Sequence, residues 1–530
     1  MNRIYVLDCT LRDGGYCNEW NFGEKNIQYI LAGLEQANAD IIECGFLTKK
    51  VKHTPAISKF DTFEQLKEVI TPIKKYSQYV AMINYGEYPI EEIPENTDGI
   101  IDGLRIAFHK KDVDDALEYC RKVQEKGYKV FVQAMVSINY TDAEFLRMID
   151  KVNEFKPFAM YIVDSFGSME KKQLMRFFYL SDNNLDNDIN VGFHSHNNLQ
   201  FAYSNAQTLI EMNTDRNLIL DSSIMGMGRG AGNLNTELIV KYLNEKYGEH
   251  YRITPLLNVI DEVLELLYKE NYWGYSLPNY LSAKHNCHPN YANFLSKKDT
   301  LTVENINKIF ESMPMEKRCD FDRAYIEQVY NDFMEQGNSR AAQYEMLKSK
   351  FMGKTVLLIA SGQSIDSNAD KIASAAKDAD TISISVNFLY PDIDVDYVFM
   401  SNLKRYQEMM NADTGLSNTK VIAVSNIPVD SYSLKVSYNE YKMSIPEISD
   451  NSGLMLIKLL IRLGVSKVII AGMDGYTDDE KKNYTSYQLS FAKKKDEIKQ
   501  INTCIENTLR DYKKVVDIEF ITPTIYNTDK

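Results

Sequence analysis

Short apolar runs with strand character alternate with amphipathic stretches along the first 250 residues. Eight runs rich in β-branched and aromatic residues stand at 4–8, 40–46, 79–84, 103–108, 129–135, 159–164, 189–194 and 218–223. Between them, apolar residues recur at helical spacing, as in 112–127 and 198–212. Eight strand-plus-helix units over this length predict a (β/α)8 barrel, and a doubly wound sheet is the alternative.

The remainder of the chain shows two further patterns. Residues 251–349 carry helical periodicity, as in TPLLNVIDEVLELLYKE, and predict a helical extension packed on the barrel. After Gly353, buried-type strands alternate with helices, at 354–365, 381–388, 395–402, 420–426 and 467–474. Such runs favour a parallel sheet covered on both faces. The predicted fold class is α/β: a TIM barrel over 1–250, the extension over 251–349 and a separate Rossmann-like domain over 350–530.

Composition and charge narrow the class of protein. The chain is 44% hydrophobic and 25% charged, as is typical of soluble globular proteins, and its net charge of −14 argues against a nucleic-acid partner. No apolar run approaches the roughly 18 residues of a membrane span, so we expect a cytoplasmic protein, and we also expect a homo-oligomer. Seven scattered cysteines without a CxxC pair predict reduced thiols.

The barrel prediction places chemistry where the strands end. Polar residues do occur at these positions, namely Asp8, Glu43, Asn84, Gln133, Asp164, His194 and Asp221. Three of them, Glu43, Asn84 and Gln133, are candidates for orienting a substrate, and each could equally be a hydrogen-bonded residue of the rim.

The stretch GFHSHNN places two imidazoles on one face of a strand, because residues i and i+2 point the same way. Asp13 follows the first strand and Asn233 follows the last, and barrel closure brings these strands beside the histidine strand. One carboxylate and two imidazoles leave open positions for a chelating substrate on a divalent cation. The alternative is that His194 and His196 are ordinary hydrogen-bonded or exposed histidines.

Three ordered motifs carry a family resemblance over about residues 1–295. LDCTLRDGGY (7–16), GFHSHNN (192–198) and GRGAGNLNTE (228–237) resemble the signature of metal-dependent barrel lyases and synthases related to HMG-CoA lyase. The 4-hydroxy-2-oxovalerate aldolase branch is most similar, through GLRIAF (103–108), YIVDSFGSM (161–169) and GYSLPNY (274–280).

The resemblance implies roles for individual residues. It implies a divalent metal, with Mn²⁺ first and Mg²⁺, Co²⁺ or Zn²⁺ as alternatives. The implied metal residues are Asp13, His194, His196 and, in the metal shell, Asn233. The implied substrate residues are Arg12, which stabilises an enolate, Ser165, near the pyruvate carboxylate, and Tyr275, which lines the pocket.

One position departs from the aldolase branch. Those enzymes place a histidine base three residues after the metal aspartate, whereas this chain has Tyr16. A tyrosine with a pKa near 10 is a poor base at neutral pH unless its surroundings lower that pKa. Three explanations are open: Tyr16 is activated, another group serves as the base, or the chemistry differs. His285 and His288 are reserve candidates for the base.

The C-terminal stretch LLIASGQSI resembles a strand followed by a turn whose backbone N–H groups can hold phosphate. The order of motifs over about 350–525 is similar to bacterial sialyltransferase-like domains. Together these features imply a nucleotide or sugar contact by Ser361, Gly362, Asn387, Ser452, Gly453, Asp474 and Tyr476. No histidine follows His288, so the transferase base has no counterpart, and a purely structural sheet domain is the alternative.

The resulting hypothesis is a metal-dependent aldolase or lyase that joins or splits a pyruvate-type enolate and an aldehyde. Its predicted partners are a 2-oxo acid, an aldehyde and a nucleotide or nucleotide-sugar, in carbohydrate or surface-polysaccharide precursor metabolism. The alternatives are an acyl-CoA lyase or synthase on the same barrel, and a glycosyltransferase working through the C-terminal domain.

Overall fold

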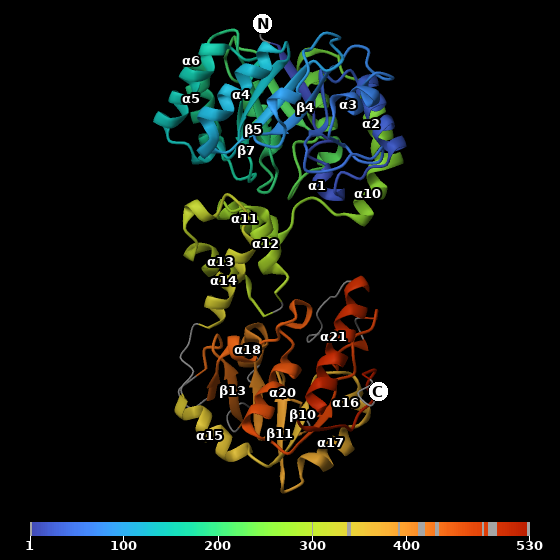
Figure 1. Ribbon diagram of the computed structural model, residues 1–530, viewed down its shortest axis with the longest axis vertical. Helices are drawn as coiled ribbons and strands as arrows, with labels where there is room; N and C mark the ends of the chain where they lie inside the picture. Colours follow the sequence, from blue (N-terminus) through green and yellow to red (C-terminus); the bar gives the residue numbers. More distant parts are fainter. Residues whose placement is uncertain are drawn as a thin grey trace. The chain divides into compact units, whose positions relative to one another are not determined.

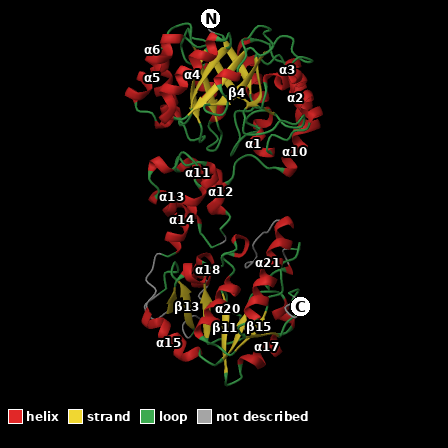
Figure 2. Cartoon of the chain, in the orientation of Figure 1, coloured by secondary structure: helices red, strands yellow, loops and turns green. Residues whose placement is uncertain are grey.

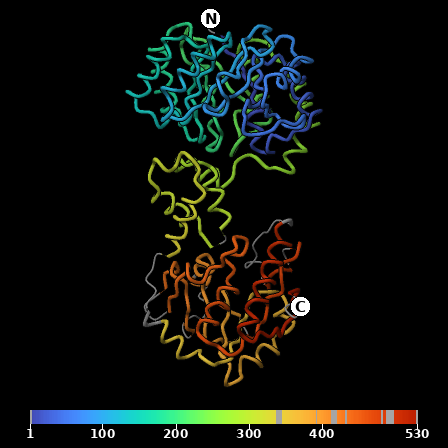
Figure 3. Tube along the Cα trace, in the orientation of Figure 1, coloured from blue at the N-terminus to red at the C-terminus, as the bar shows by residue number. Residues whose placement is uncertain are grey.

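The computed structural model describes residues 3–298, 300–335, 341–390, 393–411, 419–429, 434–479, 482–485 and 495–526. It divides into two compact units (Figures 1 and 3). The barrel unit comprises Met1–Asn293 and Pro314–Phe321, and the sheet unit comprises Phe294–Met313 and Asp322–Lys530. The boundary between the units passes through the predicted helical extension, and the three-part division at 250 and 349 stays a prediction.

The barrel unit contains a closed parallel barrel of eight strands, as predicted (Figure 2). β1 pairs with both β9 and β2, which closes the sheet, and the two-residue strand β3 adds to β2 outside the ring. The strands are β1 (Ile4–Asp8), β2 (Ile41–Leu47), β3 (Lys59–Phe60), β4 (Gln78–Asn84), β5 (Gly103–Phe108), β6 (Lys129–Ala134), β7 (Ala159–Asp164), β8 (Asn190–Ser195) and β9 (Leu218–Ser222).

Helices follow the strands and cover the outside of the barrel. Both α3 and α5 begin at capping boxes, in which the side chains of Thr62 and Thr141 accept a backbone N–H and the third helical residue bonds back. The helices are α1 (Gly15–Asn18), α2 (Glu24–Gln36), α3 (Phe63–Ile70), α4 (Val113–Glu125), α5 (Asp142–Phe155), α6 (Lys171–Asn184), α7 (Ala202–Ile210) and α8 (Thr236–Tyr247).

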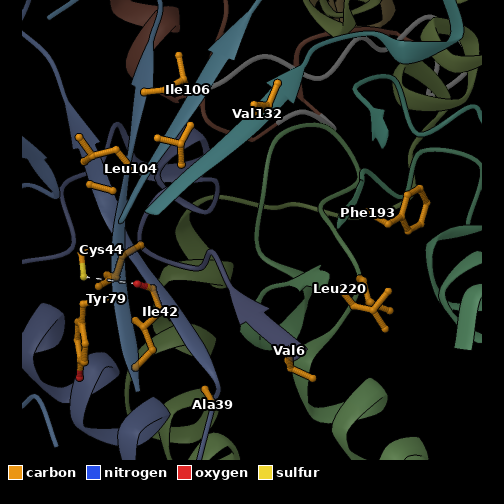
Figure 4. Packing of buried hydrophobic residues seen from close by; sticks show 14 of the residues in the cluster. Val6, Ala39, Ile42, Cys44, Tyr79, Leu104, Ile106, Val132, Phe193 and Leu220 are labelled. Carbon is orange, nitrogen blue, oxygen red and sulfur yellow. Dashed lines mark hydrogen bonds between the residues drawn. The ribbon is translucent and has the colours of Figure 1, made fainter. Parts of the chain in front are cut away.

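Alternate strand residues serve two separate apolar layers, because successive side chains point to opposite faces. The outer layer, part of which Figure 4 shows, packs Ile42, Leu104 and Val132 against the helices. The inner layer includes Phe131 and Tyr161. Gly192 gives the Tyr161 ring its space, since a Cβ there would lie 2.3 Å from ring carbons.

Every second residue of a strand faces the barrel interior, and this alternation also explains where the polar residues gather. Continuing the inward-facing positions toward the carboxyl ends of the strands leads from apolar residues to Glu43, Arg105, Gln133, His194 and Asp221. All five are buried, with at most 5% of each residue exposed. The top of the barrel interior is therefore polar and charged although its middle is apolar.

Helices after the barrel belong to both units. They are α9 (Ile253–Val259), the π-helical turn η5 (Ile260–Leu264), α10 (Glu265–Glu270), α11 (Leu277–Lys284), α12 (Pro289–Ser296), α13 (Val303–Ser312), α14 (Arg323–Met334) and α15 (Ala341–Phe351). No helix in the described residues is both long enough and apolar enough to cross a bilayer.

The sheet unit holds a seven-stranded parallel sheet in the order β14-β13-β12-β11-β10-β15-β16. The strands are β10 (Thr355–Ile359), β11 (Thr381–Val386), β12 (Tyr397–Met400), β13 (Lys420–Val424), β14 (Leu434–Val436), β15 (Lys467–Ala471) and β16 (Asp517–Phe520). Its helices include α17 (Ala369–Ala376), α18 (Leu403–Asn411), α20 (Ser452–Leu463) and α21 (Lys495–Lys513). The chain reverses direction across the sheet between β10 and β15, where doubly wound folds bind ligands.

Candidate metal centre

Three predicted metal ligands converge at the top of the barrel. Asp13, His194 and His196 each offer one ligand atom, and these atoms lie within 4.8 Å of one another. All three side chains are buried. We call these three residues the metal group.

Local structure places each member. His194 lies on β8, and His196 follows it and forms an isolated bridge with Asn233 of the loop after β9. Asp13 lies in the turn after β1, where its N–H donates to the Cys9 carbonyl. Gly228 permits the close approach of this loop, since a Cβ there would lie 2.6 Å from Asp13 Oδ2 and 2.2 Å from Asn233 Nδ2.

The donor atoms fit a divalent cation. Asn233 Nδ2 donates to Asp13 Oδ2 at 2.7 Å, while Asn233 Oδ1 and His196 Nδ1 are buried without a hydrogen-bond partner in the described residues. Burial lowers the pKa of His196 to about 3, so its imidazole is neutral. Burial opposes ionisation of Asp13, but the nearby positive charge of Arg12 helps to hold its pKa below the ordinary value. A carboxylate and two neutral imidazoles suit Mn²⁺, Co²⁺, Fe²⁺ or Zn²⁺.

A chain of buried charges connects the two sides of the metal group. Arg12 donates to Asp13 Oδ1 at 2.6 Å and to Glu43 Oε2 at 2.8 Å. Arg105 donates to the same Glu43 oxygen at 2.7 Å and also to Asp221. We call Arg12, Asp13, Glu43, Arg105, Asp221 and His194 the charge network.

The last link of the charge network orients His194, a member of the metal group. His194 Nδ1 lies 3.0 Å from Asp221 Oδ2. Because Arg105 holds Asp221 as a carboxylate, we assign the proton to His194 Nδ1, which leaves Nε2 with its lone pair. Burial opposes the charge of Asp221, yet Arg105 and His194 lower its pKa below the ordinary value.

The predicted substrate residues differ in their burial and in their hydrogen-bond partners. Glu43 belongs to the charge network, and Gln133 is buried with Nε2 unpartnered within the described residues. Ser165 Oγ accepts the Val136 N–H at 2.9 Å, so its hydroxyl is engaged in the loop. Asn84 is half-buried, and its Nδ2 donates to Glu87 at 3.2 Å.

The two predicted tyrosines are both partly open to solvent. Tyr16 is 42% exposed, and its ring contacts Trp20 at a centroid distance of 4.6 Å. Loss of hydration raises the pKa of the Tyr16 hydroxyl, although Arg229 opposes this change, and the result disfavours Tyr16 as a base. Tyr275 is 55% exposed, and it belongs to neither the metal group nor the charge network.

Sequence reasoning missed two arginines. Arg105 interrupts the apolar run GLRIAF at an inward-facing position, a signal that could have marked it as a partner for rim carboxylates. Arg229 lies in a glycine-rich loop where no pattern distinguishes it. Asp221 was expected only as a rim residue, and its contact with His194 depends on barrel register.

In the sheet unit, the predicted nucleotide residues form two clusters, one after β10 and β15 and the other after β11 and β12. In the first, Gly362 N–H donates to the Gly472 carbonyl at 2.9 Å, and Ser364 donates to Asp474. Ser361 accepts the Thr485 N–H at 2.9 Å, and the Tyr476 N–H donates to Asn502 at 3.0 Å. In the second, Asn387 donates to Ser452 Oγ at 2.6 Å and to Ser401, with Gly453 following at the start of α20.

A closed parallel barrel with a buried Asp-His-His group defines a class of metal-binding barrel enzymes. Residues 3–261 match the family model described as HMGL-like, and this part of the chain is an HMGL-like domain. The predicted family is thereby confirmed. The match ends at residue 261, so the likeness of the C-terminal part to sialyltransferase-like domains stays a prediction.

Similar proteins include curated enzymes and solved structures. A 4-hydroxy-2-oxovalerate aldolase of Pelotomaculum thermopropionicum is 26% identical over 46% of this chain and 70% of its own length. An oxaloacetate decarboxylase of Mycobacterium tuberculosis is also 26% identical, with the same coverage of both chains. An HMG-CoA lyase structure from Brucella melitensis covers 50% of this chain and 99% of its own, at 14% identity and a TM-score of 0.40. The family and the curated relatives support a metal-dependent lyase.

Proposed function

We propose that the barrel unit is a divalent-metal-dependent aldolase that forms or cleaves a carbon–carbon bond between a pyruvate-type enolate and an aldehyde. The observation that carries the proposal is the buried metal group with the Arg12 guanidinium beside it. In the synthetic direction, a methyl carbon of pyruvate loses a proton and attacks the aldehyde carbon. The aldehyde oxygen takes up a proton, so the product is a 4-hydroxy-2-oxo acid and no other reactant is needed.

A bound divalent cation would supply Lewis acidity to the carbonyl of the 2-oxo acid. Arg12 would supply a second, fixed positive charge. Burial disfavours that charge, but Glu43 and Asp13 raise the pKa of Arg12 well above its ordinary value. Its NH2 nitrogen is buried and has no hydrogen-bond partner among the described residues, so it is available to a developing oxyanion.

Deuterium exchange into the methyl group of pyruvate tests the proposal without knowledge of the aldehyde. We expect the Mn²⁺-loaded full chain to exchange, EDTA to stop the exchange and added Mn²⁺ to restore it. His194→Ala should lose both exchange and bound metal. His250→Ala, at an exposed histidine of the same unit, should retain both.

The result that contradicts an aldolase is metal-loaded protein that binds no oxalate and exchanges no pyruvate protons. Binding of acetyl-CoA without oxalate would instead favour the acyl-CoA alternative. Exchange that persists after complete metal removal would exclude the metal-dependent mechanism.

We further propose that the sheet unit binds a nucleotide or nucleotide-sugar at the carboxyl ends of β10, β11, β12 and β15. The support is the direction change of the sheet at this position, together with the clustered Asn387, Ser401 and Ser452 side chains. Calorimetric titration of the full chain with CMP tests this role. Asn387→Ala should weaken binding at least tenfold while Asn183→Ala, on the surface of α6, should not; equal affinities would contradict the assignment.

A further inference from the structure

A third guanidinium lies beside the metal group, on the loop after β9. The Arg229 side chain donates from NH2 to the Ser165 carbonyl at 3.0 Å, and its backbone N–H donates to Asp13 Oδ2 at 3.4 Å. Its guanidinium carbon lies 5.5 Å from the centroid of the Tyr16 ring. Arg229 therefore lies beside both Asp13 of the metal group and the partly exposed Tyr16.

Arg229 differs from the two arginines of the charge network in its partners. Arg12 and Arg105 each contact two carboxylates. Within the described residues, Arg229 forms no ion pair with a carboxylate side chain, and its buried Nε has no hydrogen-bond partner. A buried charged donor without a partner is unfavourable, so an incoming anion would be stabilised there.

Charge balance also favours a second anion. The acids and arginines of the charge network are three carboxylates and two guanidinium groups, which together carry a formal charge of −1. Arg229 and a divalent cation would change this to two positive charges, of which a 2-oxo acid neutralises one. Two other buried carboxylates, Asp8 and Asp164, lie outside the charge network and accept hydrogen bonds from neutral donors of their own.

The positive charge of Arg229 also acts on His288, a histidine of the same unit. Burial, together with the positive charge of Arg229, lowers the pKa of His288 to about 3. His288 Nδ1 accepts the Asn290 N–H at 3.2 Å, so the neutral ring carries its proton on Nε2 and is a hydrogen-bond donor. His288 is thus a neutral hydrogen-bond donor within the electrostatic reach of Arg229.

We propose that Arg229 determines specificity by binding an oxyanion carried by the aldehyde partner. The inference rests on the proposed aldolase function and names its substrate class: an aldehyde with a carboxylate or phosphate group. The product would then carry a second anionic group beyond its 2-oxo acid end. Arg12 would serve the reacting carbonyl, and Arg229 would hold the far end of the acceptor.

Matched aldehyde pairs test this assignment with the Mn²⁺-loaded full chain and pyruvate. Succinic semialdehyde against butyraldehyde measures the preference for a carboxylate, and glyceraldehyde 3-phosphate against glyceraldehyde measures that for a phosphate. The quantity to compare is the ratio of kcat/KM within each pair. We expect wild type to favour one anionic member, and Arg229→Ala to lower that ratio by roughly 10- to 100-fold.

Two further variants separate a specific contact from general effects. Arg229→Lys keeps the charge and should restore part of the ratio, with the anionic aldehyde's KM still raised. Arg121→Ala removes an exposed arginine that pairs with Glu118 and Glu125 on α4, and it should leave the ratio unchanged. It controls for a loss of overall positive charge.

The outcomes distinguish this inference from the function on which it rests. An unchanged ratio in Arg229→Ala, or no anionic preference in wild type, overturns the subsite while pyruvate proton exchange still supports an aldolase. Loss of exchange in wild-type protein overturns both. A preference confined to the carboxylate pair or to the phosphate pair identifies which oxyanion Arg229 binds.

Discussion

Replacing Arg105 with methionine should destabilise the barrel unit by roughly 3–5 kcal/mol. Arg105 has no exposed surface, and it donates to Glu43 and Asp221 while its guanidinium lies 4.9 Å from the Tyr161 ring centroid. Methionine fills a similar volume with an apolar chain, so the main change is electrostatic. Two buried carboxylates then lose a shared cation.

The magnitude follows from what remains around each carboxylate. Glu43 keeps its bond from Arg12 at 2.8 Å, and Asp221 keeps His194 at 3.0 Å. Each acid is therefore left with one partner rather than none, which keeps the loss near that of one broken buried ion pair. Arg121→Met is the surface control, and loss of its exposed pairs should amount to less than about 1 kcal/mol.

Urea unfolding monitored by tryptophan fluorescence reports on the barrel unit alone. The chain has two tryptophans, Trp20 and Trp273, and both belong to that unit, so the signal avoids averaging over two units. Glu43→Gln should lower the free energy of unfolding much less in the Arg105→Met background than in wild type. In that background it removes a buried charge that has already lost a partner. If Arg105→Met and Arg121→Met shift the midpoint equally, the charge network does not stabilise the barrel.

Three further variants test other parts of the same site. Asp221→Asn should weaken Mn²⁺ binding by about 10- to 100-fold in a metal titration, because it loosens His194; unchanged affinity would show that His194 needs no such partner. Arg12→Lys should slow pyruvate proton exchange by about 10²- to 10³-fold, and exchange within tenfold of wild type would remove Arg12 from the reaction. Burial raises the pKa of Asp8 from 3.8 to about 6, so its contribution to stability is present below pH 3.8 and is lost as the pH rises through 6. Relative to wild type, Asp8→Asn should gain about 1.4 kcal/mol in urea unfolding between pH 5 and 7.5, whereas a constant difference would contradict the raised pKa.

The eight barrel strands could be predicted because parallel strands buried on both faces read as near-continuous apolar runs. The predicted run at 4–8 coincides with β1, and that at 159–164 coincides with β7. The two-residue strand β3 and the three-residue strand β14 are too short to leave such a signal. β16 was missed because its sequence DIEF alternates acidic and apolar residues within a helical and polar context.

The metal group could be predicted because it depends on local parity and strand order. His194 and His196 point the same way on any strand, and closure of the barrel places Asp13 beside them. The partners of His194 depend instead on register between strands distant in sequence. Val191 pairs with Leu218 across β8 and β9, and only that alignment brings Asp221 to the imidazole.

The buried negative charge of the charge network favours binding of a cation even without substrate. Its net negative charge is buried, and among the described residues the His196 Nδ1 and Asn233 Oδ1 atoms have no hydrogen-bond partner. Asp13 comes from the turn after the first strand and His194 from β8. One cation would therefore contact residues from the beginning and the end of the barrel sequence. Because a ligand that binds only the folded state stabilises it by mass action, metal binding and closure of the barrel should be coupled. Arg105 then has a double role: it holds Asp221 in place for His194, and it limits the negative charge that the folded barrel must carry when no metal is bound.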